Sequence, residues 1–378
     1  MEFKLTEEQQ EIRKMVREFA QGVLAPRAEE IDVTNEFPMD NVRELAKHDL
    51  MGIAYPEEYG GAGADVISEA IAVEEVSAAC LATGSIMTAH YLGFDAIYLA
   101  GNEEQKRKYL TPAYTGEQLA AFCLTEPDAG TDMSANKTTA VLEGEEYVLN
   151  GVKHFITNGA YADFMTVFAL TDKSKGTKGM SAFIVEKGTP GLEYGTGDNK
   201  MGIRGARTHE IIFKDCRVPK ENLIGVEGDG YKLALHVIDR GRIGIAAMAV
   251  GLAQASLDAA VKYAKEREVF GRPIAKFQGI QWMLAEMATD VEAARMLTYY
   301  AADMKERGVR FSKEAAMAKL FASEASHRVV HKALQIHGGY GYMKEYVVER
   351  LYRDQRILEI FEGTSQVQKM VISGNLLK

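Results

Sequence analysis

The chain has 378 residues, of which 47% are hydrophobic and 26% charged, and its formal net charge is −10. This length exceeds what one compact core usually supports, so we expect two or three domains. The acidic balance argues against nucleic acid as the main partner, because a phosphate backbone requires a basic face. No apolar run approaches the ~20 residues that span a bilayer, and the acidic start is unlike a signal or transit peptide. The three scattered cysteines fit a reducing compartment, so the sequence predicts a cytoplasmic protein without membrane insertion.

Residues 1–120 have the pattern of an N-terminal α-helical domain. Thr6 and Gln9 are spaced as a capping box, and apolar residues recur at helical spacing after them. A Gly-rich loop precedes a second helical pattern at 66–82. Asn102 and the acidic residues that follow it predict a further helix start.

The composition changes twice more along the chain. Residues 121–227 consist of short β-branched and aromatic runs, broken by Glu-Gly and Asn-Gly pairs that are hairpin signals. We therefore expect a middle antiparallel β domain, a sandwich or a barrel. Residues 228–378 contain one proline, Pro273, within long Ala-rich helical patterns, which predict a C-terminal four-helix bundle. The predicted fold class is mainly α with an inserted β domain.

Several common catalytic and binding motifs are missing from the sequence. The glycines of "GVEGDGYK" follow no βαβ pattern, so a Rossmann dinucleotide site is not supported. There is no P-loop and no G-x-S-x-G elbow. His327 and His331 in "HRVVH" lie one helical turn apart, but they lack the glutamate of hydrolytic zinc helices. We predict no metal site and expect ordinary packing or surface histidines.

Three stretches carry polar groups suited to a ligand, and each has an ordinary alternative. The turn in "TEPDAGTD" presents hydroxyls and N–H groups that suit a cofactor edge or pyrophosphate, although any β-turn presents similar groups. Arg267 is suited to a phosphate and Gln278 to an amide or adenine edge, or both face water in an interhelix loop. Asp239 and Arg242 share a helix face, either as a surface ion pair or as a phosphate contact.

Glu362 directly follows an apolar pair, Ile360 and Phe361, in the connection between two predicted helices. One interpretation is a polar connector with a solvated acid. The other is a general base in a dry cleft, with a pKa raised by burial among apolar neighbours. Local sequence alone leaves both interpretations open.

Taken in order, the motifs resemble those of the acyl-CoA dehydrogenase family. The matching stretches are "CLTEPDAGTD", "KHFITNG", "KMGIRGARTHEIIFKDCRVP", "DRGRIGIAA", "REVFGRPIAKFQ", "QIHGGYGY" and "YRDQRILEIFEGTSQVQ". The resemblance extends over essentially the whole chain and is strongest to the short-chain, butyryl-type members. It implies one FAD per subunit, held between the β domain and the C-terminal bundle.

The resemblance also implies roles for individual residues. The positions implied to bind FAD are Phe122, Leu124, Thr125, Gly130, Thr131, Phe155, Ile156, Thr157, Arg267, Phe270, Gln278, Gln335, Gly338, Gly339, Thr364 and Gln366. The positions implied to touch the acyl-CoA are Thr131, Asp239, Arg242 and Gly363. Arg267, Gln278 and the 335–339 stretch resemble residues that reach the FAD of a neighbouring subunit in a homotetramer. Glu362 corresponds to the catalytic base, and the Gly363 backbone is expected to approach the thioester.

The implied reaction is α,β-dehydrogenation of a short-chain acyl-CoA to trans-2-enoyl-CoA. Glu362 would remove the α-proton, the β-hydride would pass to the flavin, and electrons would leave to an electron-transferring flavoprotein. One alternative uses the same scaffold as an oxidase, or on a cyclic or otherwise unusual acyl-CoA. Another is a flavin-free, non-catalytic scaffold, against which the intact Glu362, Arg267 and Gln278 argue.

Three departures from family patterns refine the expectation. Gly241 occupies the place where some branched- and long-chain members carry the base, so Glu362 has no rival there. Arg240 adds a charge within "DRGR", which is expected either to touch CoA phosphates or to face water. The stretch 80–100 contains no arginine, which disfavours a decarboxylating, glutaryl-type activity.

Overall fold

Capping side chains mark the starts of helices in the N-terminal region. The structure, a computed structural model, describes residues 4–377. Helix α1 (Glu7–Phe19) begins after Thr6, and reciprocal bonds between Thr6 and Gln9 confirm the predicted capping box. Asn102 caps α6 (Glu103–Gln105) as predicted. The remaining helices of this region are α2 (Ala28–Thr34), α3 (Met39–Lys47), α4 (Val66–Ala79), α5 (Leu81–Ala100) and α7 (Thr111–Tyr114).

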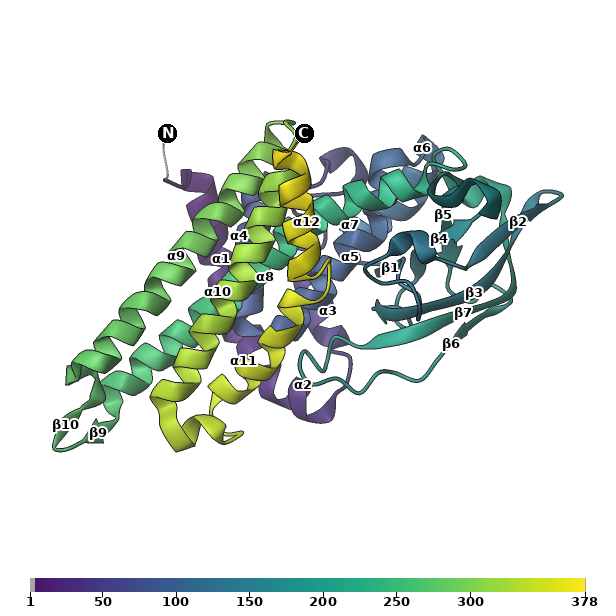
Figure 1. Ribbon diagram of the computed structural model, residues 1–378. Coiled ribbons are helices and arrows are strands. Elements are labelled where there is room, and N and C mark those ends of the chain that lie inside the picture. Colours follow the sequence, from purple (N-terminus) through teal and green to yellow (C-terminus); the bar gives the residue numbers. More distant parts are fainter. Residues whose placement is uncertain (1–3, 378) are drawn as a thin grey trace.

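Strands of the middle region form one sheet that packs beside the helices (Figure 1). They are β1 (Ala120–Cys123), β2 (Thr139–Glu143), β3 (Glu146–Thr157), β4 (Phe164–Leu170), β5 (Met180–Glu186), β6 (Leu192–Tyr194), β7 (Thr208–Pro219) and β8 (Leu223–Ile224). Their order is β6-β7-β3-β2-β4-β5-β8, with β1 beside β4. Most neighbours are antiparallel, as predicted, whereas β1 and β2 run parallel to β4. The sheet has its own apolar core, separate from the helical core.

The hairpin signals at Glu143-Gly144 and Asn150-Gly151 have different outcomes. Gly144, with φ +65°, lies in the turn that joins β2 to β3, as its signal predicts. The prediction is wrong for Asn150 and Gly151, because β3 continues through them and only its register with β7 shifts. A Cβ on Gly151 would lie 2.4 Å from the Oγ1 atom of Thr138. Close backbone approach, not chain reversal, therefore explains this glycine.

Long helices form the C-terminal bundle, as predicted. They are α8 (Gly230–Glu266), α9 (Gln278–Glu306), α10 (Ser312–His337), α11 (Val347–Gln355) and α12 (Ser365–Leu376), with a small hairpin of β9 (Glu268–Val269) and β10 (Arg272–Pro273) between α8 and α9. Among residues 4–377, α8 is the helix whose length and composition would suffice to cross a membrane, but 72% of its most apolar window is buried inside the protein. Gly251 shows why α8 packs so closely: a Cβ there would lie 2.1 Å from the Glu74 carbonyl oxygen of α4.

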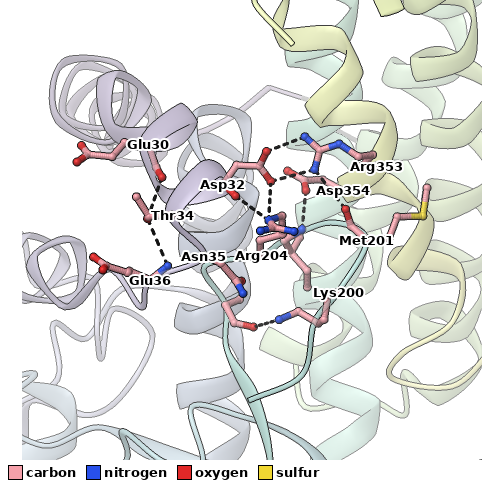
Figure 2. Close-up of polar contacts among 12 residues, drawn as sticks. Glu30, Asp32, Thr34, Asn35, Glu36, Lys200, Met201, Arg204, Arg353 and Asp354 are labelled. Carbon is pink, nitrogen blue, oxygen red and sulfur yellow. Dashed lines mark hydrogen bonds and ion pairs between the residues drawn. The ribbon is translucent and has the colours of Figure 1, made fainter. Parts of the chain in front are cut away.

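A loop between β6 and β7 ties the sheet to helices from both ends of the chain (Figure 2). Arg204 donates to the carbonyl of Asp32 at 2.7 Å, and Arg353 of α11 donates to the Asp32 carboxylate at 2.6 Å. The N–H of Ile203 donates to Asp354 at 2.5 Å. Burial raises the pKa of Asp354 to about 6. The 195–207 loop, α2 and α11 are thus joined by one partly buried ionic cluster.

Candidate active site

Glu362 and Gly363 form a sharp turn between the short 3-10 helix η10 (Arg356–Glu359) and α12. Their φ angles are +51° and +89°, both in the left-handed region. This conformation is strained for glutamate, by roughly 1–3 kcal/mol, so the surroundings must hold it. At the second position the φ of +89° favours glycine, and a Cβ there would also lie 2.7 Å from the Nε2 atom of Gln368, which would have to move.

Side chains from two helices hold this turn by its carbonyl oxygens. The ammonium of Lys319, on α10, donates to the carbonyl of Gly363 at 2.7 Å. Gln368, on α12, donates to the carbonyls of Gly363 at 2.8 Å and Glu362 at 3.1 Å. Thr364 then caps α12 by accepting from the N–H of Val367. The turn is therefore fastened on both sides.

Glu362 is partly buried, and one oxygen of its carboxylate points into the protein. Its Oε2 atom is buried without a hydrogen-bond partner, and a Cβ on Gly241 would lie 3.1 Å from it. Burial raises the pKa of Glu362 to about 7, against the opposing charges of Arg242 and Lys319. These observations exclude the solvated connector.

The two apolar residues before Glu362 differ in what they do. Phe361 packs against the main helical core, as the dry-cleft interpretation requires. Ile360 is 45% exposed, so it does not shelter the carboxylate within this chain. Leu92 of α5 lies near the carboxylate, because a Cβ on Gly241 would be 2.7 Å from its Cδ2 atom and 3.1 Å from Glu362 Oε2.

Polar atoms without partners gather around this turn. The Nε of Arg242, the Oε2 of Glu362, the Oγ of Ser365 and the Oε1 of Gln368 are all buried and lack a hydrogen-bond partner. No backbone carbonyl in residues 4–377 accepts from the N–H of Glu362. Buried polar groups are normally paired, so a cluster of unpaired ones indicates a place for polar atoms of a ligand.

Arg242 and Asp239 form one unit on the face of α8 that approaches Glu362. The guanidinium donates to the Asp239 carboxylate at 2.5 Å, and the hydroxyl of Ser312 donates to the other oxygen of Asp239. Burial lowers the pKa of Arg242, while Asp239 and Glu362 raise it. The pair is buried, so it is not the solvated surface ion pair that the sequence left open.

Arg240 lies in neither of the two places expected for it from the sequence. Its side chain is 7% exposed and is paired with Glu69 at 2.5 Å and Asp95 at 3.1 Å. The guanidinium also lies 3.9 Å from the ring centre of Tyr55. Both predicted locations, at CoA phosphates or in water, are therefore wrong. The physical reason is that the buried helices α4 and α5 carry two carboxylates that require a cation.

A buried lysine holds the conformation of the turn after β1. This turn contains Thr125, Gly130 and Thr131, which were predicted to bind a cofactor. The fully buried ammonium of Lys153 donates to Glu126 at 2.8 Å, to the Leu124 carbonyl at 3.1 Å and to Asn136 at 2.6 Å. Gly130 and Thr131 are exposed at the tip. The turn is thus a fixed polar rim with accessible backbone and hydroxyl groups. Lys153 was missed by sequence reasoning, although it stands within "KHFITNG".

A bulge in β3 presents an aromatic ring near this rim. Pairing with β7 shifts between Lys153 and Ile156, and the intervening Phe155 has a φ of +59° and is 63% exposed. Ile156 is buried and Thr157 ends the strand. Bulges commonly re-aim a side chain at a functional site. An exposed ring held in a strained backbone, beside a turn rich in donors, fits a planar cofactor with a polar edge. Phe122, in β1, packs against Phe168 with ring centres 5.1 Å apart.

The remaining predicted cofactor residues lie at the other end of the bundle, near the β9–β10 hairpin (Figure 1). They include Arg267, Phe270 and Gln278 by the hairpin and Gln335, Gly338 and Gly339 at the end of α10. A cavity of about 520 Å³ here is lined by Arg267, Gly338 and Gly339, among others. Phe270, with a φ of +51°, is 94% exposed. One chain therefore does not bring this group together with the β1 turn.

The last two predicted cofactor positions lie at the start of α12. Thr364 follows Gly363 as the N-cap of α12, and Gln366 is exposed in the first turn of that helix. His327 contacts Gln355 at 3.1 Å and Glu359 at 3.3 Å. In residues 4–377 no group of three or more His, Cys, Asp or Glu side chains is arranged to hold a metal ion.

The chain matches family models along nearly its whole length. They are the acyl-CoA dehydrogenase N-terminal domain at residues 6–117, the middle domain at 121–216 and the C-terminal domain at 228–377. Together with the helix–sheet–helix layout and the buried, unpaired carboxylate, these matches define a flavin-dependent thioester oxidoreductase. The chain belongs to the acyl-CoA dehydrogenase family, and it is an FAD-dependent enzyme.

Several individual members of the family are similar to the chain over its full length. A short-chain specific acyl-CoA dehydrogenase from Clostridium acetobutylicum is 52% identical over 379 residues, covering 100% of both chains. The butyryl-CoA dehydrogenase of Megasphaera elsdenii superposes with a TM-score of 0.98 at 46% identity, again over 100% of both chains. A chain in a structure described as the electron transferring flavoprotein of Acidaminococcus fermentans matches with a TM-score of 0.99 and 52% identity over 100% of both.

Proposed function

We propose that the protein oxidises short-chain acyl-CoA thioesters, such as butyryl-CoA, to trans-2-enoyl-CoA, and that Glu362 removes the α-proton. The observation that carries this proposal is the buried Oε2 atom of Glu362, which has no partner and belongs to a carboxyl group with a pKa of about 7. A base is most effective when its pKa lies near the working pH. The short-chain preference is supported by the similarity to the Clostridium and Megasphaera enzymes.

The turn supplies two functions from one residue. The carboxylate of Glu362 accepts the α-proton, while its unpaired N–H is available to the thioester carbonyl, on which charge develops as the proton leaves. Fixed donors of this kind contribute ~3 kcal/mol each when they match the transition state. Bound FAD supplies the acceptor for the hydride that leaves the β-carbon. Arg242 and Asp239, together with Thr131 and Gly363, are proposed to contact the acyl-CoA.

The β1 turn and the β3 bulge are proposed to hold the flavin. Their donors, hydroxyls and exposed ring suit a planar, polar-edged molecule. The residues proposed for this contact are Phe122, Leu124, Thr125, Gly130, Thr131, Phe155, Ile156, Thr157, Thr364 and Gln366. The residues proposed to reach the FAD of a neighbouring subunit are Arg267, Phe270, Gln278, Gln335, Gly338 and Gly339. This second group lies at the opposite end of the bundle from the β1 turn, so its role depends on assembly, for which we propose a homotetramer.

Other features of the proposal follow from the resemblance and the relatives. We propose domain boundaries at 1–120, 121–227 and 228–378, and a cytoplasmic location. An electron-transferring flavoprotein is proposed as the electron acceptor, since a nearly superposable chain occurs in a structure described by that name.

The test is anaerobic mixing of the yellow enzyme with acyl-CoA substrates of four to sixteen carbons, followed by absorbance of the flavin. We expect the fastest bleaching with butyryl-CoA, and recolouring by an electron-transferring flavoprotein much faster than by air. Glu362→Gln should keep its FAD and lose ~10²–10⁴-fold in the bleaching rate. Retention of half the rate in this variant contradicts the role of Glu362, and rapid recolouring by air indicates an oxidase instead.

A further inference from the structure

A buried lysine that belongs to none of the sequence motifs contacts the catalytic turn. Lys319 lies in α10, and its side chain is completely buried. Its ammonium donates to the carbonyl of Gly363 at 2.7 Å, so it binds the backbone next to Glu362 instead of a carboxylate. Burying an ammonium is costly unless it gains strong compensating interactions. The presence of a lysine on a buried, Ala-rich face of α10 therefore needs a functional or structural explanation.

The charged groups around Lys319 come from three other elements and from its own helix. Glu362 lies in the turn, Arg242 on α8 and Glu359 on η10, while Glu324 is on α10 itself. Burial lowers the pKa of Lys319 to about 8, and Glu362 raises it. Glu362 responds in the opposite sense. Burial raises the pKa of its carboxyl group, and the positive charges of Arg242 and Lys319 lower it.

We propose that Lys319 is a positioning residue for the reaction: it holds the Gly363 carbonyl, and its charge stabilises the ionised form of the base. The inference rests on the proposed role of Glu362. The geometry behind it is the left-handed pair Glu362–Gly363, whose carbonyls are bound by Lys319 and Gln368. With the carbonyl fixed, the carboxylate and the N–H of Glu362 remain aimed at one place.

The decisive variant is Lys319→Met, which keeps an unbranched side chain one atom shorter and removes both the charge and the donor. We expect the apparent pKa of the base, read from kcat/KM against pH, to move upward by about 1 unit or more, the size typical of one lost neighbouring charge. A merely structural role would lower the rate by the same factor at every pH. The matched control is Lys332→Met, on the same helix, which removes a lysine paired with Glu286 at 2.6 Å and should leave the profile unchanged.

A second measurement reads the carboxyl group without turnover. Infrared spectra of the FAD-loaded enzyme carrying ¹³C-glutamate give a protonated carboxyl band, and the band lost in Glu362→Gln identifies Glu362. In Lys319→Met this band should titrate at higher pH than in the wild type. Should Lys319→Met fail to fold, Lys319→Gln keeps a donor for Gly363 while removing the charge, and must still raise the apparent pKa.

The outcomes separate the two proposals. If Glu362→Gln is inactive but the Lys319 variants titrate as the wild type does, the positioning role is overturned and the proposed function stands. If Glu362→Gln remains active, the proposed function fails whatever the Lys319 variants do. An upward shift that is reversed by Lys319→Arg, which restores the charge, supports the role of Lys319 in full.

Discussion

The backbone of Gly241 in α8 lies directly against the carboxylate of Glu362, such that a Cβ on Gly241 would be 3.1 Å from Oε2. Gly241 belongs to α8 and Glu362 to the turn before α12, but the two residues face the same point in the site. This arrangement fits the resemblance, in which some members carry the base at the position of Gly241. In this chain the absence of a side chain there leaves room for the carboxylate of Glu362.

Gly241→Ala should therefore impair catalysis without unfolding the helix. The new methyl group would lie 2.7 Å from Leu92 and 3.1 Å from Glu362 Oε2, so the carboxylate has to move. At this distance the shift is a few tenths of an ångström, and since a full 1 Å misplacement can cost ~10²-fold in rate, we expect a smaller loss, of roughly 3- to 10-fold. The measurement is flavin bleaching by butyryl-CoA at equal FAD content. Gly244→Ala, one turn away and facing Thr88, is the control, and equal rates in the two variants contradict this account.

Activity should depend on the ionisation of Glu362. Because the pKa of this carboxyl group is raised to about 7, the group is protonated at lower pH and unable to accept the α-proton. We expect kcat/KM for butyryl-CoA to rise with pH, to level off above about pH 7, and to fall about tenfold per pH unit well below it. A flat profile between pH 5 and 8 is incompatible with this base.

The same pKa predicts a stability change in Glu362→Gln. The folded-state pKa of about 7 lies above the ordinary value of 4.5, so the folded state binds this proton more tightly than the unfolded state does. The associated stability is present below about pH 4.5 and is lost as the pH rises through 7, by ~3 kcal/mol in total. Glu362→Gln avoids this loss, so its Tm should exceed that of the wild type at pH 8 and nearly match it at pH 5. If the Tm difference between Glu362→Gln and the wild type is the same at both pH values, the raised pKa of Glu362 is contradicted.

Lys153→Met should weaken FAD retention by releasing the β1 turn. It leaves Glu126 buried without its cation, a change that typically costs ~3–5 kcal/mol. FAD fluorescence and Tm are the measurements. Lys137→Met is the control, because Lys137 pairs with Asp128 at 2.8 Å on the exposed side of the same turn, and little effect is expected. The double variant Lys153→Met/Glu126→Gln should regain part of the stability, since no buried charge is left alone and the amide oxygen can still accept from the N–H groups of residues 137 and 138. Wild-type FAD affinity in Lys153→Met refutes the role of the pair.

Local signals in the sequence predicted the elements well, because they act within one turn of chain. The Thr6–Gln9 box, the Asn102 cap and the Glu-Gly hairpin are examples. Asn150-Gly151 misled because strand pairing overrides a turn preference. A two-residue turn signal carries no information about another segment that packs against it, and here Thr138 packs against Gly151.

The surroundings of the site were beyond the reach of local sequence for the same reason. Whether Glu362 is sheltered depends on Leu92, Gly241 and Lys319, which come from three other helices. Arg240 looked free because its acidic partners are supplied by α4 and α5. The family resemblance pointed to Glu362 as the base, but only the packed structure shows what surrounds its carboxyl group.

Asp32 and Arg353 fasten the 195–207 loop between helices from the two ends of the chain (Figure 2). Rotating the sheet away from the helices would require three bonds of this loop to break together: Arg204 to the Asp32 carbonyl, Arg353 to the Met201 carbonyl, and the N–H of Ile203 to Asp354. These bonds therefore oppose a rigid-body motion of the sheet relative to the helical regions. We expect turnover to proceed on a rigid frame, with small local motions alone admitting the thioester and discharging its unsaturated product.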